Sequence, residues 1–141
     1  MRYGSVLLLM LLCLSPAASW AEEDEEALNI TQRVTVHLRD FRFEPSTITL
    51  KAGETVELTL INDGTVLHEF VIPSFHNLTV DLETAGVIAE TLGVVEMELL
   101  PKATIVLRFT PEEPGTHPFA CHVKKPKDHF AAGMTGTLIV K

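Results

Sequence analysis

The stretch PFACHVKKPKDHFAAGM, from Pro118 to Met134, decides the fold of this 141-residue sequence. It contains Cys121, two histidines (His122 and His129) and a methionine at its end. A thiolate, imidazoles and a thioether together form the donor set of a mononuclear site that cycles between Cu(I) and Cu(II). Cu(I) favours soft sulfur and Cu(II) favours nitrogen, so a mixed set suits neither state fully and little must move when an electron arrives. The segment therefore predicts one copper ion per chain.

Such a site needs a further ligand from outside this loop, on a strand near the same end of the fold. The stretch VLHEFVIP, residues 66–73, supplies a histidine, His68, in an apolar strand-like segment. A lone histidine there would more often be a core residue with satisfied hydrogen bonds. Considered together with the Cys121 cluster, His68 becomes the predicted remote ligand.

The amino-terminal residues have the pattern of a cleavable secretory signal. Arg2 precedes an apolar run, residues 6–14, which is too short to span a bilayer, and small residues follow it. We expect a signal peptide over 1–21, an acidic linker over 22–32 and one domain over 33–141. The expected location is the periplasm, with no membrane span in the mature chain.

Cys13 lies in the predicted signal, where lipidation is an alternative, although the bulky Leu12 before it does not fit that pattern. Loss of the signal leaves Cys121 as the lone cysteine of an exported protein, which calls for a chemical reason. Removing the segment 1–21 takes one positive charge, Arg2, from a chain of net charge −8, leaving −9. This acidity argues against nucleic acid or an anionic membrane as a partner. A monomer is the default expectation.

From Arg33 onward the apolar residues mostly alternate with polar ones, as half-buried strands require. Turn signals such as Asn62-Asp63-Gly64 and the Pro111–Gly115 segment separate the runs. We therefore predict an all-β Greek-key sandwich of seven to eight strands, closed by the segment 133–141. The crossover over 76–93 is ambiguous, with either a short helix or irregular structure expected there.

The sequence resembles the cupredoxins, small blue copper proteins similar to plastocyanin. The resemblance is carried by FRFEPSTITLKAGETVELTLIND (41–63), LHEFVIP (67–73), and PGTHPFACHV followed by HFAAGMTGTLIV, ending at Val140. It covers nearly the whole predicted domain. It implies the copper ligands His68, Cys121, His129 and Met134.

The Cys121-to-His129 segment is longer than in most plastocyanin-like proteins, which leaves both His129 and His122 as candidates for the second imidazole. Side chains alternate along a strand, so His122, next to Cys121, should point away from a metal that the cysteine faces. This favours His129. In multicopper oxidases a histidine beside the cysteine leads to a trinuclear cluster, but that class requires paired His-x-His motifs, which the sequence lacks.

Two further features bear on the surroundings of the site. Glu69 follows His68 where several family members carry Asn, so a hydrogen bond near the thiolate is expected to be replaced or missing. Lys124, Lys125 and Lys127 stand in an acidic chain. They form either a solvated loop or a ring that attracts an acidic redox partner.

The resemblance implies an exported one-electron carrier between redox proteins, with no catalytic residues and no substrate of its own. The alternative within the copper proteins is a carrier or resistance protein that sequesters or delivers copper. The mature chain has only Met97 and Met134 and no Met-rich or His-rich tract, which weighs against a scavenger. A copper-free sandwich that mediates adhesion, with Cys121 simply buried, is a third hypothesis.

Overall fold

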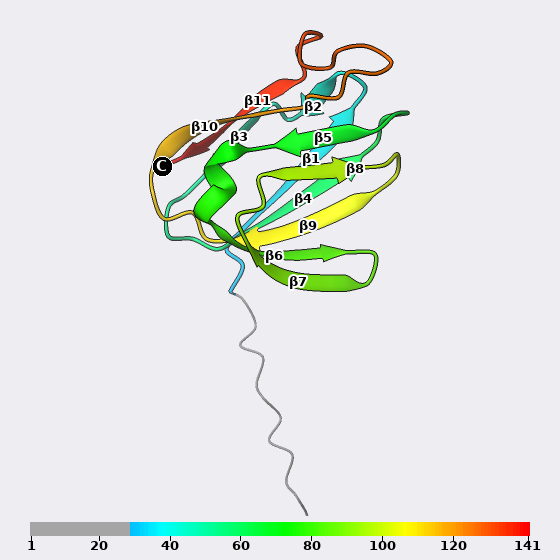
Figure 1. Ribbon diagram of the computed structural model, residues 1–141. Coiled ribbons are helices and arrows are strands. Elements are labelled where there is room, and N and C mark those ends of the chain that lie inside the picture. The colour runs from blue at the N-terminus through cyan, green and yellow to red at the C-terminus, as the bar shows by residue number, and fades with distance from the viewer. Residues whose placement is uncertain (1–28) are drawn as a thin grey trace, which may run out of the picture.

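Residues 29–141 are described by the computed structural model, and they form two β-sheets packed face to face (Figure 1). The predicted signal peptide, 1–21, and most of the predicted linker, 22–32, lie outside the described residues. The strands are β1 (Gln32–Arg39), β2 (Arg42–Glu44), β3 (Thr47–Leu50), β4 (Val56–Asn62), β5 (His68–Val71), β6 (Thr79–Thr84), β7 (Val87–Leu92), β8 (Glu96–Leu99), β9 (Thr104–Phe109), β10 (Gly115–Ala120) and β11 (Thr135–Val140). One short 3₁₀ helix, η1 (Pro73–Asn77), follows β5.

The first sheet has the order β2-β1-β4-β9-β6-β7, and the second has the order β3-β11-β10-β5-β8. The predicted all-β sandwich is confirmed. The described chain has eleven strand segments rather than seven or eight, partly because β2 and β3 are short separate strands at the sheet edges. The predicted closing strand forms as β11, which pairs antiparallel with β10 and parallel with β3.

Alternation along the strands places the core between the sheets. In β4, Val56, Leu58 and Leu60 are buried, and the residues between them are half-buried. In β9, Ile105, Leu107 and Phe109 repeat the pattern. The two strands pair antiparallel, with Leu58 opposite Leu107. Period-two hydrophobicity thus gives both sheets an apolar inner face, as sandwich packing requires.

The crossover over 76–93 does not form the short helix that the sequence allowed. After η1, residues 79–92 form the antiparallel hairpin β6–β7, with Thr84 opposite Val87. The two turn residues, Ala85 and Gly86, both have positive φ, 46° and 82°. This is the backbone of the tight hairpin turns that match strand twist. β6 then pairs with β9, so the hairpin extends the first sheet.

Three aromatic rings fill the core of the sandwich. Phe119 stacks on Phe70 with ring centroids 4.7 Å apart and meets Phe43 edge-on at 5.0 Å. Gly136 lies against Phe119, where a Cβ would overlap the ring and approach the Ser46 carbonyl at 2.7 Å. The last residues before Cys121 are therefore held in the core by this packing.

Over residues 29–141, no helix has the length and apolarity needed to cross a membrane.

Candidate metal centre

His68 opens β5, and its position is fixed by the turn that precedes it. Asn62, fully buried at the end of β4, donates from Nδ2 to the carbonyls of Val66 (2.9 Å) and Leu99 (2.7 Å). Its Oδ1 accepts from the Gly64 amide at 2.9 Å. These three bonds tie the turn to β8, the neighbour of β5. His68 enters the second sheet with its side chain fully buried.

Cys121 and Met134 stand at the two ends of the loop between β10 and β11, which lies at one end of the sandwich (Figure 1). The Cys121 amide donates to the Met134 carbonyl at 3.1 Å, which continues the hairpin pairing by one step. Within the loop, the His129 amide donates to the Val123 carbonyl (2.9 Å), and the Met134 amide to the His129 carbonyl (3.0 Å). The loop backbone itself therefore folds His129 back toward the cysteine.

The structure brings three predicted ligand atoms together in a buried cluster. The Nδ1 atoms of His68 and His129 are 3.2 Å apart, and Cys121 Sγ is 3.2 Å from His129 Nδ1. All three side chains are fully buried, and their ligand atoms lie within 4.8 Å of one another. Met134, also fully buried, lies close to them. A thiol and two imidazoles converge with no ion pair between them, which is the arrangement of a soft metal site.

Burial shifts the pKa of two members of the cluster, Cys121 and His68. It raises the pKa of the Cys121 thiol, and the backbone hydrogen bonds that the sulfur accepts from Glu69 and Val123 only partly oppose this. Burial is also the main cause that lowers the pKa of His68, and the charge of His129 acts in the same direction. Asp40 opposes it. His68 is therefore neutral near pH 7, with a lone pair available for a metal.

The outer nitrogen of His68 has a carboxylate partner that the sequence analysis did not find. His68 Nε2 lies 3.3 Å from Asp40 Oδ1, and the Asp40 carboxylate accepts from the Thr65 amide and hydroxyl, both at 2.8 Å. A Cβ on Gly64 would lie 2.5 Å from both Asp40 Oδ1 and His68 Nε2. A carboxylate on the far nitrogen fixes the ring's orientation and tautomer, as in many metal sites.

Glu69 makes two contacts next to the thiol. Its amide donates to Cys121 Sγ at 3.3 Å, and its carboxylate Oε2 accepts from the His122 amide at 3.0 Å. Near the thiol, where the sequence predicted a hydrogen bond to be replaced or missing, both the backbone and the side chain of Glu69 form hydrogen bonds. The side chain of Glu69 ties β5 to the residue after the cysteine.

The two histidine candidates occupy different places. His129 belongs to the buried cluster, whereas His122 is exposed and stacks on Phe130 with centroids 5.1 Å apart. Of the histidines outside the cluster, His76 is also exposed, and His37 and His117 are half-buried. The alternation of side chains along the strand accounts for the outward direction of His122.

His129 has a further aromatic neighbour. The ring of Phe41, from the turn between β1 and β2, meets it edge-on at 5.0 Å. His129 Nε2 is buried and has no hydrogen-bond partner within residues 29–141. Neither Phe41 nor Asp40 was among the predicted site residues. The only sequence signal for them was their place in a turn next to Phe43, because their contacts depend on long-range packing.

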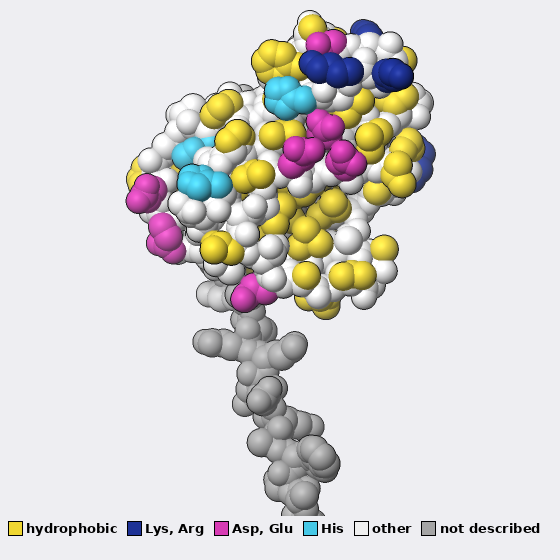
Figure 2. Space-filling model, in the orientation of Figure 1, with side chains coloured by type: hydrophobic (Ala, Val, Ile, Leu, Met, Phe, Trp, Pro, Cys, Tyr) yellow, Lys and Arg dark blue, Asp and Glu magenta, His cyan; other side chains and the backbone are white. Residues whose placement is uncertain are grey.

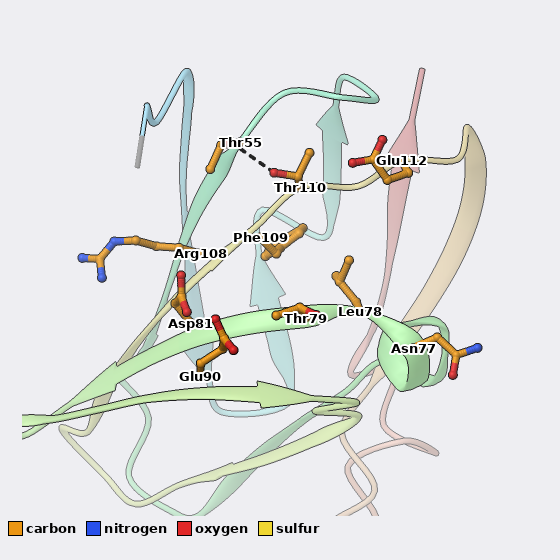
Figure 3. A pocket seen from close by; sticks show the side chains of 10 residues that line it. All are labelled: Thr55, Asn77, Leu78, Thr79, Asp81, Glu90, Arg108, Phe109, Thr110 and Glu112. Carbon is orange, nitrogen blue, oxygen red and sulfur yellow. Dashed lines mark hydrogen bonds between the residues drawn. The ribbon is translucent and has the colours of Figure 1, made fainter. Parts of the chain in front are cut away.

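A hollow of about 450 Å³ lies away from the cluster, beside the β6–β7 hairpin and β9 (Figure 3). Charged side chains, Asp81, Glu90 and Arg108, line it together with Thr55 and Thr110, whose hydroxyls are 3.1 Å apart. None of its lining residues is a cysteine or a histidine. The thiol and the imidazoles of the buried cluster are thus separate from this hollow.

The fold and the cluster define a class: a small β-sandwich with a buried thiol and imidazoles at one end. A family model, the Cupredoxin-like domain, matches residues 4–140. The chain is 31% identical to the copper-resistant cuproprotein CopI of Rubrivivax gelatinosus over 121 residues, covering 82% of this chain and 70% of that protein. It is 32% identical to the plastocyanin of Dryopteris crassirhizoma over 107 residues, covering 72% and 90%.

Among solved structures, reduced auracyanin from the photosynthetic bacterium Roseiflexus castenholzii superposes with a TM-score of 0.56 at 21% identity. The match covers 79% of this chain and 98% of that one, and it supports the fold alone. The chain belongs to the cupredoxin-like family, and the metal of this blue copper fold, copper, is its cofactor. The buried thiol and imidazoles fit that metal by their donor types and by the neutral state of His68.

Proposed function

We propose that this protein binds one copper ion through His68, Cys121, His129 and Met134 and carries single electrons between redox proteins. The observation that carries the proposal is the convergence of Cys121 Sγ and two imidazole Nδ1 atoms in a pocket closed to water. Copper bound there supplies a Cu(I)/Cu(II) couple. No group on the chain is proposed to transform a substrate.

The protein's own contribution is to hold these donors fixed in both oxidation states. Asp40 orients His68, the Glu69 amide binds the sulfur, and the loop backbone positions His129. The thiol provides the strong soft donor, and the methionine at the loop end is the proposed weak axial donor. A rigid, dry site leaves little to rearrange when the electron count changes.

The test is the visible and electron paramagnetic resonance spectrum of the purified protein with Cu(II). We expect an intense thiolate-to-copper absorption and a narrow copper hyperfine splitting. Both should be lost in Cys121→Ala and changed in His129→Ala. His122→Ala is the matched control, since its ring is exposed, and it should keep the wild-type spectrum. A colourless copper complex, or a signal that survives loss of Cys121, would contradict the proposal.

A second candidate is a copper carrier or resistance protein, favoured by the similarity to CopI over 82% of the chain. The two functions differ in how fast copper leaves. Reversible electrochemistry with slow transfer of Cu(I) to a chelator supports the electron carrier, whereas rapid transfer supports the copper carrier. Export through the signal peptide 1–21 is part of both proposals, and mass spectrometry of the protein secreted by a bacterial host tests it.

The loop lysines are the proposed contact for an acidic redox partner. Lys124 pairs with Asp128 at 2.8 Å, and Lys127 lies over the Phe41 ring, while Lys125 is exposed. Figure 2 shows basic side chains at the loop end of the molecule and acidic side chains below them. On β5 and β8, Glu69, Glu96 and Glu98 form an acidic cluster, with carboxylate oxygens within 4.8 Å of one another. We expect Lys125→Glu to slow electron exchange with an acidic protein, and the difference to shrink as salt rises.

A further inference from the structure

Two residues that are not proposed ligands, Phe41 and Lys127, lie on the side of the metal centre next to His129. Phe41 comes from the β1–β2 turn, far from the cysteine loop in sequence. Its ring meets the His129 ring at an interplanar angle of 90°, with centroids 5.0 Å apart. Lys127, two residues before His129 in the loop, places its Nζ 3.7 Å from the centre of the Phe41 ring. Two residues of the cysteine loop, His129 and Lys127, thus both contact the Phe41 ring.

The backbone of Phe41 indicates that this arrangement is held by its contacts. Its φ is 67°, in the left-handed region that a bulky residue rarely adopts. Such a conformation costs free energy and persists only where the surroundings enforce it. The Phe41 ring makes two such contacts, one with the edge-on ring of His129 and one with the Lys127 ammonium over its face.

The state of His129 indicates what the cover does. Its Nδ1 faces Cys121 and His68, and its Nε2 is buried with no partner in residues 29–141. The ring is fully buried among packed side chains, and Phe41 is its aromatic neighbour outside the cluster. The histidine is therefore shielded from solvent on its outer side.

We propose that Phe41, clamped by Lys127, is a positioning residue that holds His129 in the cluster and excludes water and small donor ligands from the metal. This rests on the copper site proposed above. With the cover in place, an imidazole or azide molecule cannot approach from the His129 side, and His129 cannot swing out to release the metal. Removing the cover opens the centre while leaving all four proposed ligands in the chain.

The experiment uses two variants of the copper-loaded protein. Phe41→Asn removes the ring but keeps a residue that tolerates positive φ, so the turn can still form. Lys127→Gln removes only the cation. Matched controls are Phe130→Asn, an exposed aromatic of the same loop that stacks on His122, and Lys125→Gln, an exposed lysine of the same loop.

Two readouts follow each protein: the imidazole concentration that converts the electron paramagnetic resonance signal, and the rate of Cu(I) transfer to a chelator. We expect Phe41→Asn to bind imidazole about tenfold more tightly than wild type and to lose copper about tenfold faster. Lys127→Gln should change both by about two- to fivefold. Both controls should match wild type. Thermal unfolding of the apoprotein shows that each variant folds.

Variants that fold and keep wild-type ligand access and release rates would overturn the cover while leaving the copper site intact. The proposed cover would also be overturned if Phe130→Asn changed the two readouts as much as Phe41→Asn does. If Phe41→Asn does not fold, Lys127→Gln alone decides, because its side chain lies outside the core. A wild-type protein without the thiolate-to-copper absorption would overturn the proposed function and the cover together.

Discussion

The imidazole of His68 connects the metal centre to the carboxylate of Asp40, with Nδ1 facing His129 and Nε2 lying 3.3 Å from Asp40 Oδ1. Asp40 is itself anchored by the amide and hydroxyl of Thr65. These hydrogen bonds lower the pKa of Asp40, with the Thr65 amide as the largest cause. The carboxylate is therefore charged at neutral pH. It can accept a hydrogen bond from Nε2–H, which leaves the Nδ1 lone pair free for the metal.

Gly64→Ala tests whether this pair needs the space beside it. A Cβ would lie 2.5 Å from both Asp40 Oδ1 and His68 Nε2, so one of them must move. We expect a loss of about 1–3 kcal/mol in apoprotein stability, measured by urea unfolding. The copper spectrum should also shift, because the His68 ring is displaced. Unchanged stability and an unchanged spectrum would show that the turn relaxes without disturbing the pair.

Asp40→Asn separates charge from space at the same contact. The amide keeps the size of the carboxylate and one acceptor oxygen, so the steric clash of the alanine variant is absent. We expect weaker copper binding with a fold that stays intact, since second-layer partners of metal ligands typically contribute about 10–100-fold in affinity. A competition titration with a copper chelator measures this. An affinity equal to wild type would limit Asp40 to a role in the turn.

Phe119→Ala tests the aromatic core. Phe119 is 1% exposed and packs against both Phe70 and Phe43. Its removal leaves a cavity between the sheets, at a cost of about 3–5 kcal/mol in urea unfolding. Phe130→Ala is the control, because that ring is 49% exposed. It should change stability by no more than about 0.5 kcal/mol. Similar losses in both variants would contradict the assignment of the core.

The sequence predicted most of the fold because the strands follow simple alternation. The pattern of Val56, Leu58 and Leu60 requires one buried face, and the structure has it. The crossover over 76–93 was ambiguous since short apolar runs do not distinguish helix from strand. The hairpin there depends on pairing of β6 with β9 and on the turn at Ala85-Gly86, which are tertiary features.

The sequence indicated the candidate metal ligands through the chemistry of their side chains, but not the residues that surround them. Thiol, imidazole and thioether donors with loop spacing suggested Cys121, His129 and Met134, and a strand histidine suggested His68. Asp40 and Phe41 could not be found in this way, because carboxylates and aromatic residues are common in turns. Their contacts with the two histidines arise only when the β1–β2 turn packs against the cysteine loop.

Arg108 joins three strands of the first sheet. Its guanidinium donates to Glu57 at 3.0 Å and to Glu83 at 2.9 Å, from β9 to β4 and β6. The side chain is 23% exposed, so solvent screens the pairs only in part. We expect Arg108→Gln to cost about 1 kcal/mol in urea unfolding at low salt and less at high salt. A loss that does not depend on salt would assign the effect to packing of the arginine stem.

The pH dependence of copper binding follows from the opposite pKa shifts of Cys121 and His68. Burial raises the thiol pKa above its usual value of 9.0, so the apoprotein carries the thiol proton at neutral pH. Copper binds the thiolate, so binding releases that proton. Burial lowers the pKa of His68 below its usual 6.5, so above that pH this ring is already neutral and releases none.

Copper affinity should therefore rise with pH between pH 7 and the thiol pKa. Binding of Cu(II) releases about one proton from Cys121, so its affinity should rise about tenfold per pH unit, and the rise should end above the thiol pKa. Chelator competition from pH 7 to 9, with calorimetry in two buffers of different ionisation enthalpy, measures the slope and the proton count. The Cys121→Ala protein is the control and should lose this slope. An affinity flat over this range in the wild type would mean that the thiolate is already formed in the apoprotein, which would contradict the effect of its burial.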